Sequence, residues 1–176
     1  QMSPKALLEM EALARNGRVV AIGEIGLDFH YPDYNEQRQI ECFAAQAHLA
    51  GRRKLPMVIH CRDAYDQLVK VIREDRRIPR HGVIHCFSGT QEQASRLLQM
   101  GFYLGIGGAI TYPNAGALRE VIQRIGLERV LCETDAPYLP PQLKRRRTAV
   151  AQVLLQHQQR PVEVERHLSL AGNGNV

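Results

Sequence analysis

Short apolar runs alternate with amphipathic stretches along most of this sequence. The apolar runs predict strands at 18–23, 56–60, 82–86, 102–106 and 129–133. Apolar residues at helical spacing predict helices at 4–15, 36–50, 64–75, 91–100 and 114–125. Because strands that alternate with helices usually pair in parallel, the pattern predicts an α/β fold built on a parallel sheet.

Polar residues at the expected helix starts are candidate caps. Asp63 is expected to cap the helix 64–75, and either Ser88 or Thr90 the helix 91–100, while Pro113 or Asn114 begins the helix 114–125. Beyond residue 141 we expect a helical tail over 142–176, with one helix around 148–158. No repeat of fixed period is present, so the whole chain, 1–176, is predicted to be one domain.

The bulk composition is that of an ordinary soluble domain. The chain has 176 residues, 44% of them hydrophobic and 23% charged. No apolar run approaches the roughly 18 residues that a membrane span needs, so no membrane partner is expected. The first helix is charged throughout, which excludes a secretory signal.

Four cysteines occur without a C-x-x-C pair, which favours buried, reduced thiols and a cytoplasmic location. The four are Cys42, Cys61, Cys86 and Cys132. Strand alternation predicts that the last three, which lie beside the strand ends, point away from any site there.

The net charge of +5 has two interpretations. Basic clusters at 52–54, 76–80 and 144–147 either form a solvated surface or hold the phosphates of a substrate. Tyr31, Tyr34 and Tyr112 follow predicted strands and either stack on bases or pack against the protein.

Four predicted strands lead into a residue that can bind metal. These residues are Glu24, His60, His85 and Asp135. A single histidine or glutamate at such a position is usually structural. Four of them at the same topological position predict a shared site, since imidazole and carboxylate are the ligands of zinc, manganese and magnesium.

Distances then favour a barrel over a flat sheet. Neighbouring strands lie about 4.8 Å apart, so the first and fifth strands of a flat sheet in chain order are ~19 Å apart. A closed barrel brings all the strand ends to one mouth, but it needs eight strands and typically about 250 residues. We therefore predict an α/β barrel of TIM type that is incomplete in this chain.

Four segments resemble the TatD family of metal-dependent hydrolases, in the family's order. They are 23–28, 59–64, 85–89 and 133–139. The resemblance implies an amidohydrolase-like TIM barrel, a deoxyribonuclease activity with DNA as substrate, and divalent metal cofactors. Two ions per site are expected, as Mg²⁺, Mn²⁺ or Zn²⁺, in a monomeric protein.

The resemblance also implies roles for the four site residues. Glu24 matches the carboxylate that can bridge two metals, and it is expected to take part in catalysis. His60 and His85 match imidazole ligands. Asp135 matches a ligand that also accepts the proton of the attacking water.

Three further residues lie beside these motifs and are expected to bind substrate. Arg62 offers a guanidinium to a phosphate, Ser88 offers a donor, and Asp63 lies next to Arg62. Asp63 and Ser88 remain helix-cap candidates as well.

The sequence also departs from the family pattern. It has no Asp-x-His-x-His strand, and no Asn-Glu-Pro after Pro141. The chain is therefore either a piece that lacks the first strands or a divergent member. Besides the nuclease, two functions stay open: hydrolysis of a small ester, lactone or amide, and a catalytically impaired relic that binds nucleic acid.

Overall fold

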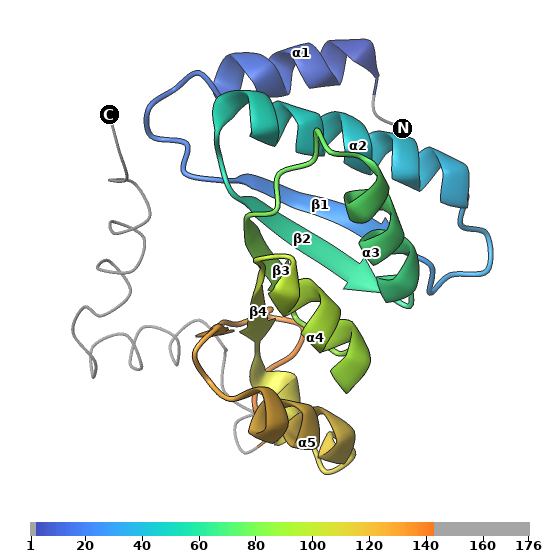
Figure 1. The fold of residues 1–176 in the computed structure, drawn as a ribbon, viewed down its shortest axis with the longest axis vertical. Helices are drawn as coiled ribbons and strands as arrows, with labels where there is room; N and C mark the ends of the chain where they lie inside the picture. Colours follow the sequence, from blue (N-terminus) through green and yellow to red (C-terminus); the bar gives the residue numbers. More distant parts are fainter. Residues whose placement is uncertain (1–2, 143–176) are drawn as a thin grey trace.

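A parallel five-stranded sheet organises the computed structural model, which describes residues 3–142 (Figure 1). The strands lie in chain order and are β1 Ile22–Asp28, β2 Met57–Arg62, β3 Gly82–His85, β4 Tyr103–Ile106 and β5 Val130–Cys132. The helices are α1 Pro4–Leu13, α2 Glu36–Arg53, α3 Tyr65–Glu74, α4 Gln91–Gln99 and α5 Gly116–Ile125, with the 3₁₀ helix η1 Gly108–Thr111 after β4. Helix α1 lies on α2, on the side away from the strands (Figure 1).

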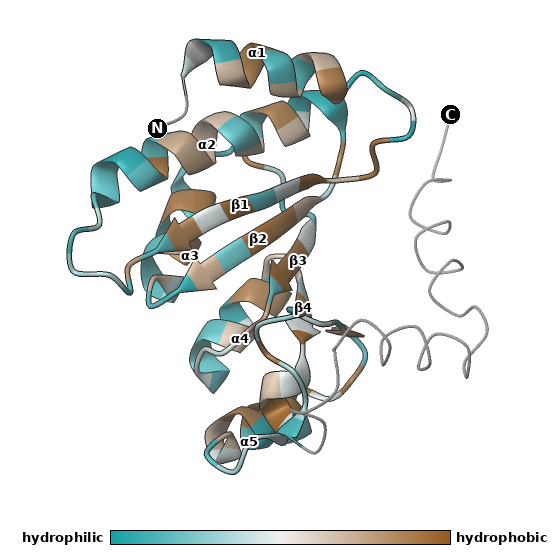
Figure 2. Ribbon diagram, turned by 180° about the vertical axis from the view of Figure 1, so that it is seen from behind, coloured by the Kyte–Doolittle hydropathy of each residue, from teal (hydrophilic) through white to brown (hydrophobic). Residues whose placement is uncertain are grey.

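One row of apolar side chains crosses the sheet in register. Ile25 pairs with Ile59, which pairs with Ile84, which pairs with Leu104, and all four side chains are buried. Burial of a side chain of this size contributes roughly 1.5–3 kcal/mol to folding. Figure 2 shows hydrophobic residues along β2 and β3, and hydrophilic and hydrophobic residues interspersed along α2.

The next row in register points to the other face of the sheet. Gly26 pairs with His60, and His60 pairs with His85. Successive residues of a strand face opposite sides of the sheet. Because the apolar row faces the helices, the two histidines, one residue further along β2 and β3, lie together on the second face.

Strand β1 begins and ends later than predicted. Val20, which was assigned to the strand, is 78% exposed, and β1 instead runs from Ile22 to Asp28. Gly26 lies beyond the predicted strand, yet it is a strand residue with φ +154°, and a Cβ there would collide with the His60 carbonyl. Glu24 therefore lies within β1 rather than at its end. A register shift between Ile22 and Ile25 leaves both of these residues buried and Glu24 on the second face.

The predicted helix caps were partly wrong. Thr90 caps α4 through a capping box with Gln93, so Ser88 does not. Asp63 does not cap α3, because its backbone is left-handed, with φ +53°, and its carboxylate faces His30. Helix α5 begins at Gly116 because residues 112–115 form a turn, so the predicted start at Pro113 or Asn114 was early.

The fold is the α/β fold predicted, and its five-stranded sheet is open within the described residues. Each edge strand, β1 and β5, has one neighbour. Apart from Gln142, the predicted tail over 142–176 lies outside the described part of the chain. Within residues 3–142, no helix has the length and apolarity to cross a membrane.

Candidate metal centre

The four residues singled out in the sequence lie side by side. His60 Nδ1 is 3.4 Å from Glu24 Oε1, and His85 Nε2 is 3.8 Å from the same oxygen. His85 Nε2 also lies 3.5 Å from Asp135 Oδ1. Glu24 and Asp135 thus share one imidazole although β1 and β5 are the two edges of the sheet. A flat sheet would hold these edges ~19 Å apart, so the sheet must curve as a barrel wall does.

Each imidazole has a second carboxylate on its far side. Asp28 Oδ2 lies 3.1 Å from His60 Nε2, and Glu133 Oε2 lies 3.0 Å from His85 Nδ1. A carboxylate on one ring nitrogen holds the proton there and orients the ring. The other nitrogen, His60 Nδ1 or His85 Nε2, then presents its lone pair toward Glu24.

This donor set fits a divalent cation. Two ligands bound about 2.1 Å from one ion lie roughly 3.0–3.5 Å apart at tetrahedral or right angles. The separations of 3.4, 3.8 and 3.5 Å between the ring nitrogens and the carboxylate oxygens are close to that range. Two imidazoles and two carboxylates are also the chemistry that zinc and manganese sites use.

Electrostatics in the cluster favour positive charge. Burial would lower the pKa of His85, but the hydrogen bond to Glu133 and the nearby Glu24 and Asp135 carboxylates raise it above its ordinary value. Burial would likewise raise the pKa of Asp28, yet the His30 backbone N–H and the His60 ring lower it overall. Carboxylates that stabilise an imidazolium equally stabilise a metal cation in its place.

Glu133 is held in position by backbone groups. Its carboxylate accepts a hydrogen bond from the Cys86 N–H, and it lies over Gly105, where a Cβ would collide with it. His85, Cys86 and Glu133 form a group whose ligand atoms lie within 4.8 Å of one another. Burial, followed by the charge of Glu133, raises the pKa of the Cys86 thiol to about 12.

The sequence matches the family model described as "TatD related DNase" over residues 1–166. The chain belongs to this family. It is 39% identical over 140 residues to "Uncharacterized metal-dependent hydrolase YabD" of Bacillus subtilis, covering 80% of this chain and 55% of the relative. It is 40% identical over 141 residues to "3'-5' ssDNA/RNA exonuclease TatD" of Klebsiella pneumoniae, covering 79% of this chain and 53% of the relative.

A solved structure agrees with the family assignment. The crystal structure of YJJV, a TatD homologue from Escherichia coli K12, matches with a TM-score of 0.74 and 40% identity over 80% of this chain and 54% of that one. The predicted family and barrel-type fold are therefore confirmed. The chain spans about half the length of the curated relatives it matches.

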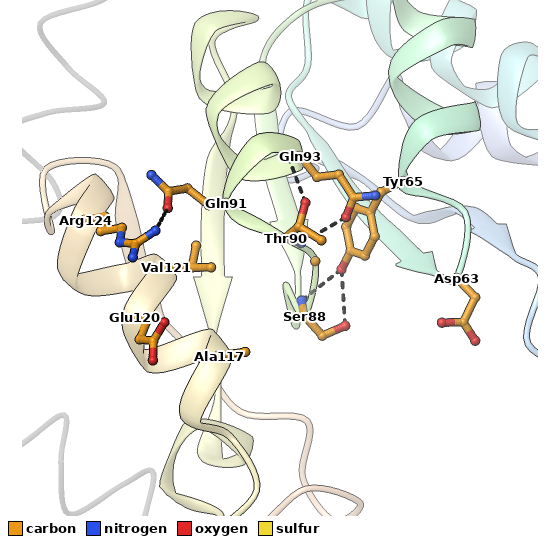
Figure 3. A pocket seen from close by; sticks show the side chains of 11 residues that line it. Asp63, Tyr65, Ser88, Thr90, Gln91, Gln93, Ala117, Glu120, Val121 and Arg124 are labelled. Carbon is orange, nitrogen blue, oxygen red and sulfur yellow. Dashed lines mark hydrogen bonds between the residues drawn. The ribbon is translucent and has the colours of Figure 1, made fainter.

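The centre of this TatD-family chain opens into a cavity of about 510 Å³. Arg62 and Ser88 lie on its wall with the four central residues. A second cavity, of about 460 Å³, adjoins it and shares Ser88. Figure 3 shows the Tyr65 hydroxyl bound to Ser88, with Arg124 of α5 on one side and Asp63 on the other. Each predicted substrate-binding residue thus lines at least one of the two cavities: Arg62 the central one, Asp63 the second, and Ser88 both.

The predicted phosphate-binding role of two basic clusters does not fit their positions. Residues 52–54 and 76–80 precede β2 and β3, so they lie at the N-terminal ends of these strands, whereas His60 and His85 lie toward the C-terminal ends. Arg52 pairs with Glu11 and Arg77 pairs with Asp75. The cluster at 144–147 lies outside the described residues.

The cysteine predictions held only in part. Cys61 is buried and Cys42 is half-buried, but Cys132 is exposed, and both Cys61 and Cys86 line the central cavity. Strand β3 ends at His85, so the alternation used to orient Cys86 does not extend to it.

Two carboxylates of the centre, Asp28 and Glu133, had no predicted role. Strand alternation was the available signal for Asp28, because it follows Glu24 by four residues and shares its face. Glu133 had no comparable signal, since its position depends on the space above Gly105 in a neighbouring strand.

Proposed function

We propose that this chain carries the metal-dependent nuclease centre of a TatD-family hydrolase and cleaves phosphodiester bonds in nucleic acid. One observation supports the proposal above the others. The Glu24 carboxylate lies between two imidazoles, and each imidazole is oriented by a carboxylate of its own. This is the arrangement of metal-binding histidines with supporting partners.

In the proposed mechanism, Glu24, His60, His85 and Asp135 would hold the divalent metal. When bound, such a metal would supply polarisation of a phosphoryl oxygen and a water with a lowered pKa. Asp135 would orient the attacking water and accept its proton, and Glu24, between the two imidazoles, would be a shared carboxylate ligand. The proton transfer is worth about 10²–10⁴-fold in rate.

Arg62 and Ser88 bind the substrate beside this centre. Both are exposed on the wall of the central cavity, where a guanidinium and a hydroxyl can donate to phosphate oxygens. Asp63 lines the adjoining cavity and binds His30, with 2.8 Å between Asp63 Oδ2 and His30 Nδ1.

Single-stranded nucleic acid is the proposed substrate. The Klebsiella relative is named an exonuclease for single-stranded DNA and RNA. The net charge of +5 also favours a polyanion. Cleavage of DNA, a monomeric state and a cytoplasmic location belong to this proposal.

Cleavage of a labelled single-stranded DNA in the presence of Mg²⁺, Mn²⁺ or Zn²⁺ tests the proposal. Asp135→Asn should lower the rate by about 100-fold or more, because it removes the proton acceptor. Asp66→Asn is the matched control, since its carboxylate pairs with Arg96 on the helix surface and should leave the rate unchanged.

Activity that survives both chelation of the metal and Asp135→Asn would contradict the scheme. Faster metal-dependent hydrolysis of a small ester than of DNA would instead favour the small-substrate hydrolase. Binding of DNA without any metal-dependent turnover would favour the impaired relic.

A further inference from the structure

The loop after β1 presents an aromatic ring beside the centre. Tyr31 is 60% exposed, and the Arg62 guanidinium carbon lies 5.9 Å from the centre of its ring. The ring of His30 meets Tyr31 edge-on, with centroids 5.3 Å apart and an interplanar angle of 82°. We call the three residues His30, Tyr31 and Arg62 the Tyr31 platform.

Two hydrogen bonds connect this platform to the metal centre. The backbone N–H of His30 donates to Asp28 Oδ1 at 3.0 Å, and the other oxygen of Asp28 faces His60. The His30 ring is fixed by Asp63 at 2.8 Å. The loop between β1 and α2, which contains His30 and Tyr31, leaves the arrowhead end of β1 (Figure 1).

Tyr34, in the same loop after β1, and Tyr112, in the loop after β4, already contact other parts of the protein. Tyr34 is stacked on Phe29, with ring centroids 4.4 Å apart and an interplanar angle of 11°. Tyr112 donates its hydroxyl hydrogen to the Pro140 carbonyl. Of the three tyrosines that the sequence offered for stacking, Tyr31 is the one whose ring remains largely exposed next to a cation.

We propose that the Tyr31 platform stacks a nucleobase of the single strand whose phosphate enters the metal centre. The inference rests on the proposed function. A flat, exposed phenol ring binds a base of any sequence through its π-face, and the adjacent guanidinium attracts the phosphate that follows. Stacking requires an unpaired base, so the platform selects single strands over duplexes.

Binding without metal tests the platform separately from catalysis. The probe is a short fluorescent oligothymidylate, and its partner is the same oligonucleotide with abasic residues, both measured in chelator against the full chain. Tyr31→Leu should weaken thymidylate binding roughly 5- to 150-fold, the range seen for loss of one stacked base. Tyr31→Phe should restore binding, and the affinity for the abasic probe should not depend on residue 31.

Tyr103→Leu is the matched control. Tyr103 also lies under a guanidinium, that of Arg129 at 5.6 Å, but at the start of β4, opposite the centre. This substitution should leave the affinity for both probes unchanged.

Equal thymidylate affinity of the wild type and Tyr31→Leu would overturn the inference. So would an equal loss on the abasic probe, because that result assigns Tyr31 to backbone contact or folding. A Tyr31-dependent affinity without any metal-dependent cleavage would support the platform and contradict the nuclease proposal. Cleavage without a role for Tyr31 would do the reverse.

Discussion

At the scale of single residues, the centre consists of two imidazoles, each placed between two carboxylates. Glu24 lies near both rings, while Asp28 and Glu133 each orient one of them. The sequence offered Glu24, His60, His85 and Asp135 as candidate ligands, and the structure brings these four together although Glu24 lies within β1 rather than at its end. The supporting carboxylates were not assigned, because their role depends on which ring nitrogen faces which strand.

Glu133→Gln tests whether the supporting carboxylate matters. The amide removes the charge that holds the proton on His85 Nδ1, so the affinity for Mn²⁺ should fall about 10- to 100-fold. Isothermal titration calorimetry measures this affinity, and circular dichroism checks the fold. Glu128→Gln, at an exposed position after α5, should leave the affinity unchanged. Unchanged Mn²⁺ affinity in Glu133→Gln would show that His85 does not rely on this carboxylate.

At the scale of elements, the alternation of five strands and five helices was predictable, and their boundaries were less so. Strand β1 was placed too early because its apolar run was taken to end at Gly23. The strand continues through Gly26, which allows the His60 backbone to approach, and that approach is a tertiary contact that no local pattern records. Asp63 likewise has a left-handed backbone, and its carboxylate binds the His30 ring, thirty-three residues away, so local sequence did not reveal that it would not cap α3.

Gly105→Ala tests the space that β4 leaves for Glu133. A Cβ at this position would collide with the Glu133 carboxylate, so overpacking should lower the free energy of unfolding by about 1–3 kcal/mol. Urea denaturation measures the change. At Gly116 in α5, the nearest atom to an added Cβ is Arg119 Nη2 at 3.9 Å, and alanine there should be neutral or stabilising. Equal stability of the two variants would mean that Glu133 relocates without cost.

Asp75 links the end of α3 to α2 and predicts a pH dependence of stability. Its carboxylate accepts hydrogen bonds from Arg77 Nε at 2.9 Å, Arg77 Nη2 at 2.8 Å and His48 Nε2 at 2.7 Å. These partners, Arg77 first, hold the Asp75 pKa well below its usual range. A folded-state pKa below that of the unfolded chain stabilises the protein above about pH 4, and this stabilisation is lost as the pH falls further.

Asp75→Asn should therefore lower the free energy of unfolding by about 1–2 kcal/mol at neutral pH. The difference from the wild type should shrink as the pH falls below about 4. Asp66→Asn, which removes an exposed pair with Arg96, should change stability by less than about 1 kcal/mol. A wild-type advantage over Asp75→Asn that stays constant down to low pH would exclude the electrostatic explanation.

At the scale of the whole molecule, the sheet keeps chain order and still brings its two edges to one imidazole. Curvature of this kind was predictable only because four potential ligands at the ends of separate strands can share one ion only if the sheet curves. The same reasoning anticipated an incomplete barrel, and the described strands form one curved wall with free edges at β1 and β5. The apolar strand patterns alone do not predict curvature, because the same patterns occur in flat, open sheets.

Anomalous diffraction from crystals of this chain soaked in Mn²⁺ tests the central claim most directly. The nuclease proposal predicts a manganese peak among Glu24, His60, His85 and Asp135, with ligand distances of roughly 2.0–2.3 Å. The peak should weaken or vanish in His85→Ala. A saturating soak that leaves no manganese between these four side chains, or that places it elsewhere, would contradict the proposed centre.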